Sequence, residues 1–163
     1  TWAQAHDDTP AKANFGGEGR NVEYREGLYV GYRYYQTAGV PVAFPFGYGL
    51  SYTSFAYSDL KADEKGVTLT VTNTGSCAGA EVVQLYVRDK VSSVITYDSQ
   101  LRGFERVSLK PGETRQVTFS LKPEDLQILD RNMNWTVEPG EFEVMIGASS
   151  QDIRLKKTIT ALP

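Results

Sequence analysis

The feature that most constrains the fold is a series of short segments, from Phe55 onward, in which apolar and polar residues alternate. The segment VTLTVTNTG (67–75) places Val67, Leu69 and Val71 on one side and threonines on the other. This period of two is typical of a β-strand with one buried face. Further runs follow, and their expected inward residues are Val83, Leu85, Val87, Leu101, Phe104, Val107, Leu109, Val117, Phe119, Leu121, Phe142, Val144, Ile146, Ile153, Leu155 and Ile159.

Turn signals separate these runs at intervals of roughly ten residues. Pro111-Gly112 and Pro139-Gly140 each occupy the centre of such a turn. With the weaker run FAYSDLKA, the pattern predicts an all-β fold of about seven strands, an antiparallel β-sandwich of the immunoglobulin or fibronectin type III kind. The immunoglobulin Cys–Trp–Cys pattern is absent, which favours the fibronectin-like variant. The segment KPEDLQILD, between two strands, is expected to form a short helical turn that starts at Pro123.

Residues 1–54 have a different character, because they are loop-like and hold 11 of the 19 aromatic residues. The segment FPFGYGLSYTSF (44–55) mixes five rings with glycine and proline, so a helix or central strand is not expected there. A sugar-binding platform, a hinge or a seam between two packing units would each account for it. The one candidate regular element is EGLYVGYRYYQ (26–36). Its periodicity fits either a strand or a helix, and we favour a short helix because bulk lies on both faces.

Several functional classes are not expected from the composition. The net charge is −3 and no run is rich in Lys or Arg, so nucleic acid is not an expected partner. No apolar stretch approaches the ~20 residues that span a bilayer, so no membrane partner is expected. The start, TWAQAHDDTP, does not have the pattern of a signal peptide, and nothing in the chain specifies its compartment.

The residue types that usually carry chemistry are scarce or scattered. His6 is the single histidine and Cys77 the single cysteine, so we expect no metal site, no cofactor and no reactive thiol. Carboxylates are plentiful but fall in turns and on polar strand faces, where solvated side chains are normal. An exposed ring among Tyr57, Tyr97 and Trp135 could bind a sugar, although a sandwich core also uses a buried Trp.

Several motifs together resemble the C-terminal end of the β-glucosidases of glycoside hydrolase family 3. They are YREGLYVGYRYYQTAGVPVAFPFGYGLSYTSF, AGAEVVQLYV, LRGFERVSLKPGET and VEPGEFEVMIGASS, and they extend over essentially the whole chain. The resemblance implies that residues 1–54 are the tail of an α/β sandwich domain with its linker. It also implies that residues 55–163 are a fibronectin type III-like domain.

The resemblance carries no catalytic residue onto this chain. The family's nucleophile is an aspartate of its barrel domain, and Ser58-Asp59-Leu60 does not match that motif. Its acid/base carboxylate lies upstream of the matched region, and Glu26 belongs to the tail motif. The chain alone is therefore expected to be an inactive part of a retaining enzyme that acts on β-linked glucosides.

The resemblance implies instead that the aromatic segment docks the sandwich onto barrel and α/β domains, in the same chain or in a second polypeptide. The expected docking residues are Tyr32, Arg33, Tyr35, Phe44, Phe46, Tyr48 and Tyr52. Such a domain would stabilise the catalytic domains and shape the rim of the substrate pocket. A carbohydrate-binding module and a protein-binding adhesion sandwich are the alternatives.

Overall fold

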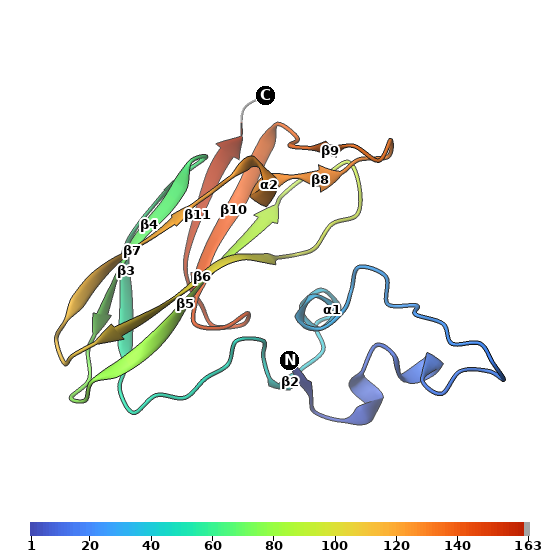
Figure 1. Ribbon diagram of the computed structural model, residues 1–163, viewed down its shortest axis with the longest axis horizontal. Coiled ribbons are helices and arrows are strands. Elements are labelled where there is room, and N and C mark those ends of the chain that lie inside the picture. Colours follow the sequence, from blue (N-terminus) through green and yellow to red (C-terminus); the bar gives the residue numbers. More distant parts are fainter. Residues whose placement is uncertain (162–163) are drawn as a thin grey trace.

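The computed structural model describes residues 1–161 and shows a two-layer antiparallel β-sandwich with an extended N-terminal segment (Figure 1). One sheet has four strands, in the order β11 (Ile153–Ala161), β10 (Gly140–Gly147), β5 (Gly79–Asp89) and β6 (Gln100–Leu109). The other has three, in the order β3 (Phe55–Asp63), β4 (Gly66–Asn73) and β7 (Thr114–Ser120). The seven strands and the sandwich fold predicted from the sequence are confirmed.

The core lies between the two sheets and follows the alternation of the sequence. On β4, Val67, Leu69 and Val71 are buried while the intervening threonines are not. Strands β5, β6 and β10 of the other sheet face them with Val83, Leu85, Val87, Val107, Leu109, Phe142, Val144 and Ile146. Strand β7, beside β4, adds Val117 and Phe119 to the core. Removal of these side chains from water is the main stabilising term of the sandwich.

The expectation that Phe104 faces the core is wrong, because it lies three and five residues from the inward Val107 and Leu109, and alternation puts it on the opposite face. The expectation for Leu101 is wrong as well, because a β-bulge interrupts β6. Leu101 is opposite Tyr86 and Gly103 is opposite Leu85, so Arg102 is an extra residue without a partner across the ladder. Leu101 therefore falls on the outer face beside Tyr86, and Phe104, on the same face, is 69% exposed. Gly103 takes the inward position instead, where a Cβ would crowd the ring of Phe119.

The connection between β7 and β10 carries three short elements. Helix α2 (Pro123–Leu126) begins at the expected proline, which confirms the helical turn. Strands β8 (Ile128–Leu129) and β9 (Trp135–Thr136) then form a small hairpin. In its turn the Asp130 carboxylate accepts hydrogen bonds from the backbone N–H groups of Asn132 and Asn134. This hairpin lies at one end of the sandwich, beside α2 (Figure 1).

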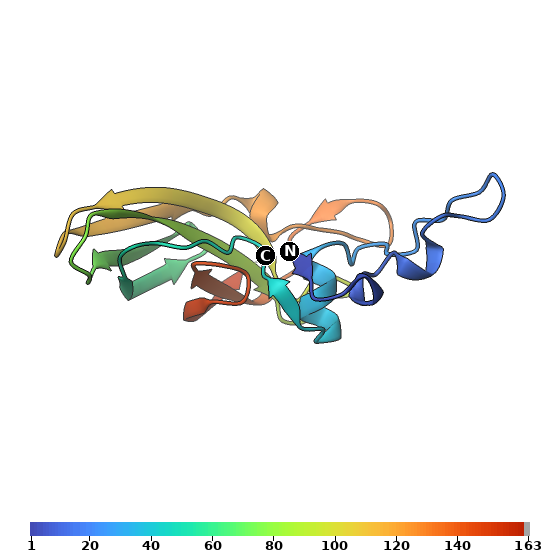
Figure 2. The same ribbon diagram turned by 90° about the horizontal axis from the view of Figure 1, so that it is seen from below.

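Residues 1–54, which we call the arm, extend from the end of the sandwich (Figure 2). Strand β1 (Trp2–Ala3) pairs with β2 (Val42–Phe44), and two short 3₁₀ helices, His6–Asp8 and Lys12–Asn14, follow β1. The favoured helix within 26–36 is confirmed but begins later, as α1 (Tyr32–Ala38). It ends at Gly39, whose left-handed backbone lets its N–H bond to the carbonyl of Tyr35.

Candidate docking surface

The central strands of the four-stranded sheet are buried on both faces, which a two-layer sandwich alone does not explain. Gln84 and Tyr86 of β5 and Met145 of β10 point away from the core, yet each is at most 6% exposed. The arm covers Gln84 and Tyr86, through Gly47 and Tyr32. The first 54 residues therefore form a third layer over part of this sheet. Some of their side chains are buried against the sheet, and the others remain exposed to solvent.

Tyr32, the first residue of α1, makes most of this contact. Its ring stacks on Phe46 at 5.0 Å and meets the ring of Tyr86 edge-on at 6.0 Å. Its hydroxyl accepts a hydrogen bond of 3.0 Å from the backbone N–H of Leu101. Tyr32 thus joins α1 to the segment around Phe46 and to strands β5 and β6, through both apolar and polar contacts.

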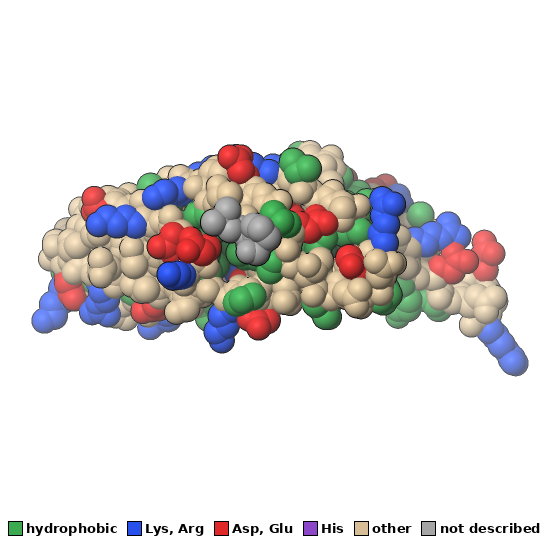
Figure 3. All heavy atoms as spheres, turned by 90° about the horizontal axis from the view of Figure 1, so that it is seen from above, with side chains coloured by type: hydrophobic (Ala, Val, Ile, Leu, Met, Phe, Trp, Pro, Cys, Tyr) green, Lys and Arg blue, Asp and Glu red, His purple; other side chains and the backbone are tan. Residues whose placement is uncertain are grey.

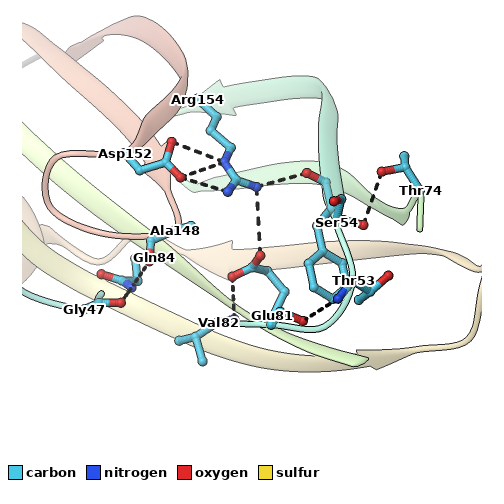
Figure 4. A network of polar contacts seen from close by, with 12 residues as sticks. Gly47, Thr53, Ser54, Thr74, Glu81, Val82, Gln84, Ala148, Asp152 and Arg154 are labelled. Carbon is cyan, nitrogen blue, oxygen red and sulfur yellow. Dashed lines mark hydrogen bonds and ion pairs between the residues drawn. The ribbon is translucent and has the colours of Figure 1, made fainter. Parts of the chain in front are cut away.

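Two glutamines supply the polar part of the contact. Gln36 of α1 donates to the Ser150 carbonyl at 2.6 Å and accepts from the Ser99 hydroxyl at 2.9 Å. Gln84 donates to the carbonyls of Gly47 and Ala148, as Figure 4 shows. Buried amides of this kind hold a segment in one position because an unpaired buried donor is costly.

The loop between β5 and β6 is held to the arm by two further contacts. The Arg33 guanidinium lies 4.6 Å from the ring centre of Tyr97, in a cation–π contact. The Tyr29 hydroxyl lies 3.4 Å from the carbonyl oxygen of Thr96. The arm and this loop therefore form one continuous surface at the end of the sandwich.

The linker that enters the sandwich is anchored by Asn73, which is fully buried. The Asn73 amide donates to the carbonyls of Cys77 and Leu109 and accepts from the Thr53 hydroxyl and the Gly75 N–H. All four hydrogen-bonding positions of this side chain are in use. The path of residues 51–55 is therefore set by the sandwich itself.

A second anchor is the charged cluster of Arg154, Asp152 and Glu81 (Figure 4). Arg154 pairs with Asp152 at 2.8 Å and lies 3.9 Å from Glu81. It also donates to the Phe55 carbonyl at 3.1 Å and lies over the ring of Tyr57. The guanidinium thus joins β11, β5 and the start of β3.

Burial raises the pKa of the Glu81 carboxyl, although Arg154 and the Val82 N–H act in the opposite direction. A pKa raised by folding means that the stabilising contribution is complete below the unfolded pKa of about 4.3 and is lost as the pH rises through the folded value. We expect the free energy of unfolding of the wild-type chain to fall relative to that of Glu81→Gln as the pH rises above about 4. Urea unfolding of both proteins at a series of pH values measures this difference.

Glu113 is the matched control, because a hydrogen bond from the Lys110 N–H and its contacts with Arg115 lower its pKa. The wild-type chain should therefore gain stability relative to Glu113→Gln as the pH rises. If the stability difference from the wild-type chain changed with pH in the same direction for both variants, the raised pKa of Glu81 would be contradicted.

On the outside of the arm, large apolar side chains remain exposed. Those of Trp2, Phe15, Tyr24, Phe44, Tyr48, Leu50 and Tyr52 are between 49% and 101% exposed. Phe44 and Tyr48 pack against each other, with ring centres 5.2 Å apart. Elsewhere, on the face shown in Figure 3, acidic and basic side chains are interspersed without an extended patch of one sign. The arm therefore combines a side attached to the sandwich with an outer side that is unusually apolar.

The seven residues expected to dock fall into two groups. Tyr32, Arg33 and Phe46 contact the sandwich, and Tyr35 is buried at 6% exposure beside Tyr34. The remaining three, Phe44, Tyr48 and Tyr52, are at least 49% exposed. Sequence reasoning missed Gln84, although a glutamine inside the apolar run VVQLYV is a signal of a buried hydrogen-bonding role.

Two other findings concern the kind of site. No group of three or more His, Cys, Asp or Glu residues within 1–161 is placed to hold a metal ion. In the same part of the chain, no helix is long and apolar enough to cross a membrane. The carboxylate pair best defined by its contacts, Glu81 with Asp152, is joined through Arg154 and serves the linker.

Comparison with known proteins agrees with the fold. Residues 81–150 match the family described as "Fibronectin type III-like domain". Thermostable beta-glucosidase B of Acetivibrio thermocellus is 48% identical over 92% of this chain and 21% of its own length. A Formosa agariphila beta-xylosidase is 48% identical over 69% of this chain and 17% of its own length. The crystal structure of the Bifidobacterium adolescentis GH3 beta-glucosidase superposes with a TM-score of 0.91 at 38% identity, over all of this chain and 26% of that one.

The sandwich is thus a fibronectin type III-like domain. The chain belongs to glycoside hydrolase family 3 and corresponds to the part of its β-glucosidases that contains this domain. It spans about a fifth of the length of the curated relatives it matches. The family resemblance expected from the motifs is confirmed.

Proposed function

We propose that this chain is a non-catalytic docking domain of a family 3 glycoside hydrolase. Residues 1–54 would be the tail and linker of the enzyme's α/β domain, and residues from 55 onward its fibronectin type III-like domain. The observation that carries the proposal is the apolar outer side of the arm, with Phe44, Tyr48 and Tyr52 exposed on a segment that the sandwich holds in place.

The energetics favour a protein partner for this surface. Covering one half-exposed ring contributes roughly 2 kcal/mol before the costs of association, at ~25 cal/mol per Å² and ~150 Å² per ring. The contributions of several rings to the binding free energy add without a large entropy cost, because contacts between the arm and the sandwich already restrict the segment that carries them. The partner would be the barrel and α/β domains of the enzyme, in the same chain or in a second polypeptide.

Within such an enzyme the chain would stabilise the catalytic domains and shape the rim of the substrate pocket. Hydrolysis of β-linked glucosides would depend on a nucleophile and an acid/base residue of the other domains. The relatives include a beta-glucosidase and a beta-xylosidase at equal identity. The sugar preference therefore would be set by residues outside the region that they share with this chain.

A binding experiment tests the proposal. The part of Thermostable beta-glucosidase B outside the matched region is produced as a separate polypeptide, and its affinity for this chain is measured by biolayer interferometry. We expect a saturable complex and no hydrolysis of p-nitrophenyl β-glucoside by this chain alone. Tyr48→Ala combined with Tyr52→Ala should raise the Kd at least about tenfold, since the two rings supply well over 1.4 kcal/mol.

Met133→Ala is the control, because its apolar side chain is 73% exposed, between the values of Tyr48 and Tyr52, but lies in the turn between β8 and β9. It should leave the Kd within about twofold. Hydrolysis by the isolated chain, or a complex that the double variant and the control weaken equally, would overturn the docking assignment.

A further inference from the structure

A cavity of about 740 Å³ opens at the end of the sandwich, apart from the exposed rings of the arm. It lies between α2, the β8–β9 hairpin and the loop that leads into β6, and Phe142 of the core is part of its lining. Its volume falls within the range of about 300–1,000 Å³ that is usual for small-molecule sites. Its lining combines the rings of Tyr97 and Trp135 with charged side chains, among them Asp89 and Arg102.

Arg102 enters this lining because of the bulge in β6. As the extra residue of the bulge, it has no partner across the ladder, and bulges often re-aim a side chain in this way. Its Nε is buried without a hydrogen-bond partner among residues 1–161, and no carboxylate of this part of the chain lies within 4.0 Å. A half-buried guanidinium in this state has donors available for a ligand.

Asp89, at the end of β5, lines the same cavity and is also only partly satisfied. One carboxylate oxygen accepts from the Val91 N–H at 3.1 Å, while the other is buried without a hydrogen-bond partner among the described residues. A buried acceptor left unpaired is costly, so an incoming hydroxyl donor would be favoured. The cavity thus offers an acceptor and a set of donors on adjacent strands.

The aromatic part of the lining is Trp135, in β9. Its side chain is 67% exposed although it lines the cavity. One side of the Tyr97 ring is occupied by Arg33, so Trp135 is the ring with more free surface. The π face of an indole is electron-rich and packs well against the C–H bonds of a pyranose ring.

The charges of the lining limit the class of ligand. Glu124 and Asp125 line the same cavity as Asp89, so an anion would meet three carboxylates. A cation would instead meet the Arg102 guanidinium, which has no ion-pair partner among the described residues. A neutral polyhydroxyl compound can donate to the carboxylates, accept from the arginine and stack on the indole.

We propose that this cavity is a binding site for a neutral oligosaccharide, in which a pyranose ring stacks on Trp135 and hydroxyl groups bind Asp89 and Arg102. The sandwich would then bind a saccharide, while the arm would dock onto the partner domains. Because the two sites use different residues, each can fail without the other.

Titration calorimetry of the chain with cellotriose, xylotriose and maltotriose tests this inference. We expect saturable binding of at least one trisaccharide. Trp135→Ala should raise its Kd at least about tenfold, and Arg102→Met should also weaken it. Tyr52→Ala, which removes an exposed ring from the arm, is the matched control and should leave the Kd unchanged.

Since Trp135 is mostly exposed, its variant should unfold at the same urea concentration as the wild-type chain, so a lost affinity reports the site. The inference is overturned if none of the three sugars binds with a Kd below about 10 mM. It is also overturned if Trp135→Ala and Arg102→Met bind as well as Tyr52→Ala. A loss of docking in the interferometry experiment, by contrast, would leave the sugar site intact.

Discussion

Asn73→Ala should lower the free energy of unfolding of this chain by about 3–5 kcal/mol. The side chain is fully buried and makes four hydrogen bonds, to Cys77, Leu109, Thr53 and Gly75. Alanine would leave these partners unpaired in a site that water cannot easily enter, in addition to a small cavity. Urea unfolding followed by far-UV circular dichroism measures the loss, which is a large part of the 5–15 kcal/mol typical of a domain.

Asn132→Ala provides the comparison, because Asn132 is exposed in the β8–β9 turn and, within residues 1–161, its side chain makes no hydrogen bond while its backbone N–H bonds to Asp130. We expect that variant within about 0.5 kcal/mol of the wild-type chain. If Asn73→Ala were equally mild, the four bonds would not anchor the linker. The start of β3 would then have to be held mainly by Arg154.

Gly47→Ala should release the arm while the sandwich remains folded. Gly47 has φ +79°, a left-handed conformation that costs an L-residue about 1–2 kcal/mol. A Cβ at this position would also overlap the amide of Gln84, which bonds to Ala148 and Tyr86. Displacing that amide forfeits further hydrogen bonds, so we expect the arm contacts to weaken by about 3 kcal/mol in total.

Hydrogen exchange reports this local opening. The backbone N–H groups of Ser150 and Leu101, which bond to Phe46 and to the Tyr32 hydroxyl, should exchange about a hundredfold faster in the variant. Amides in the middle of β4 should be unaffected. Gly49→Ala is the control, because Gly49 has no positive φ and its Cβ would meet open space. Similar exchange in both glycine variants would contradict the proposed origin of the effect.

The alternation of apolar residues was sufficient to predict the strands and the two-sheet core. Val67, Leu69 and Val71 face inward because a strand places every second side chain on one face, which is a property of the local chain. The prediction failed at Leu101, since the extra residue Arg102 reverses the facing of the strand residues that precede it. The sequence contains Arg102-Gly103 at that point but no pattern that marks a bulge.

The candidate docking site could be predicted only in part. The concentration of rings in residues 1–54 indicated a packing seam, and the motifs indicated the family. Which rings the chain itself covers could not be deduced, because that depends on where α1 lies. Tyr32 is held by Tyr86, and Tyr52 is left free, although both belong to the same aromatic segment.

The sequence by itself thus determined the β-sandwich, the aromatic arm and the family, because each follows from periodicity, composition or motif order along the chain. Only the tertiary structure decided that β5 is buried on both faces and that Gln84 bonds to Gly47, 37 residues earlier. It also decided that Arg102 and Trp135 meet at one cavity. Burial and hydrogen bonding between distant segments depend on how the layers pack, and packing has no periodic trace in the sequence.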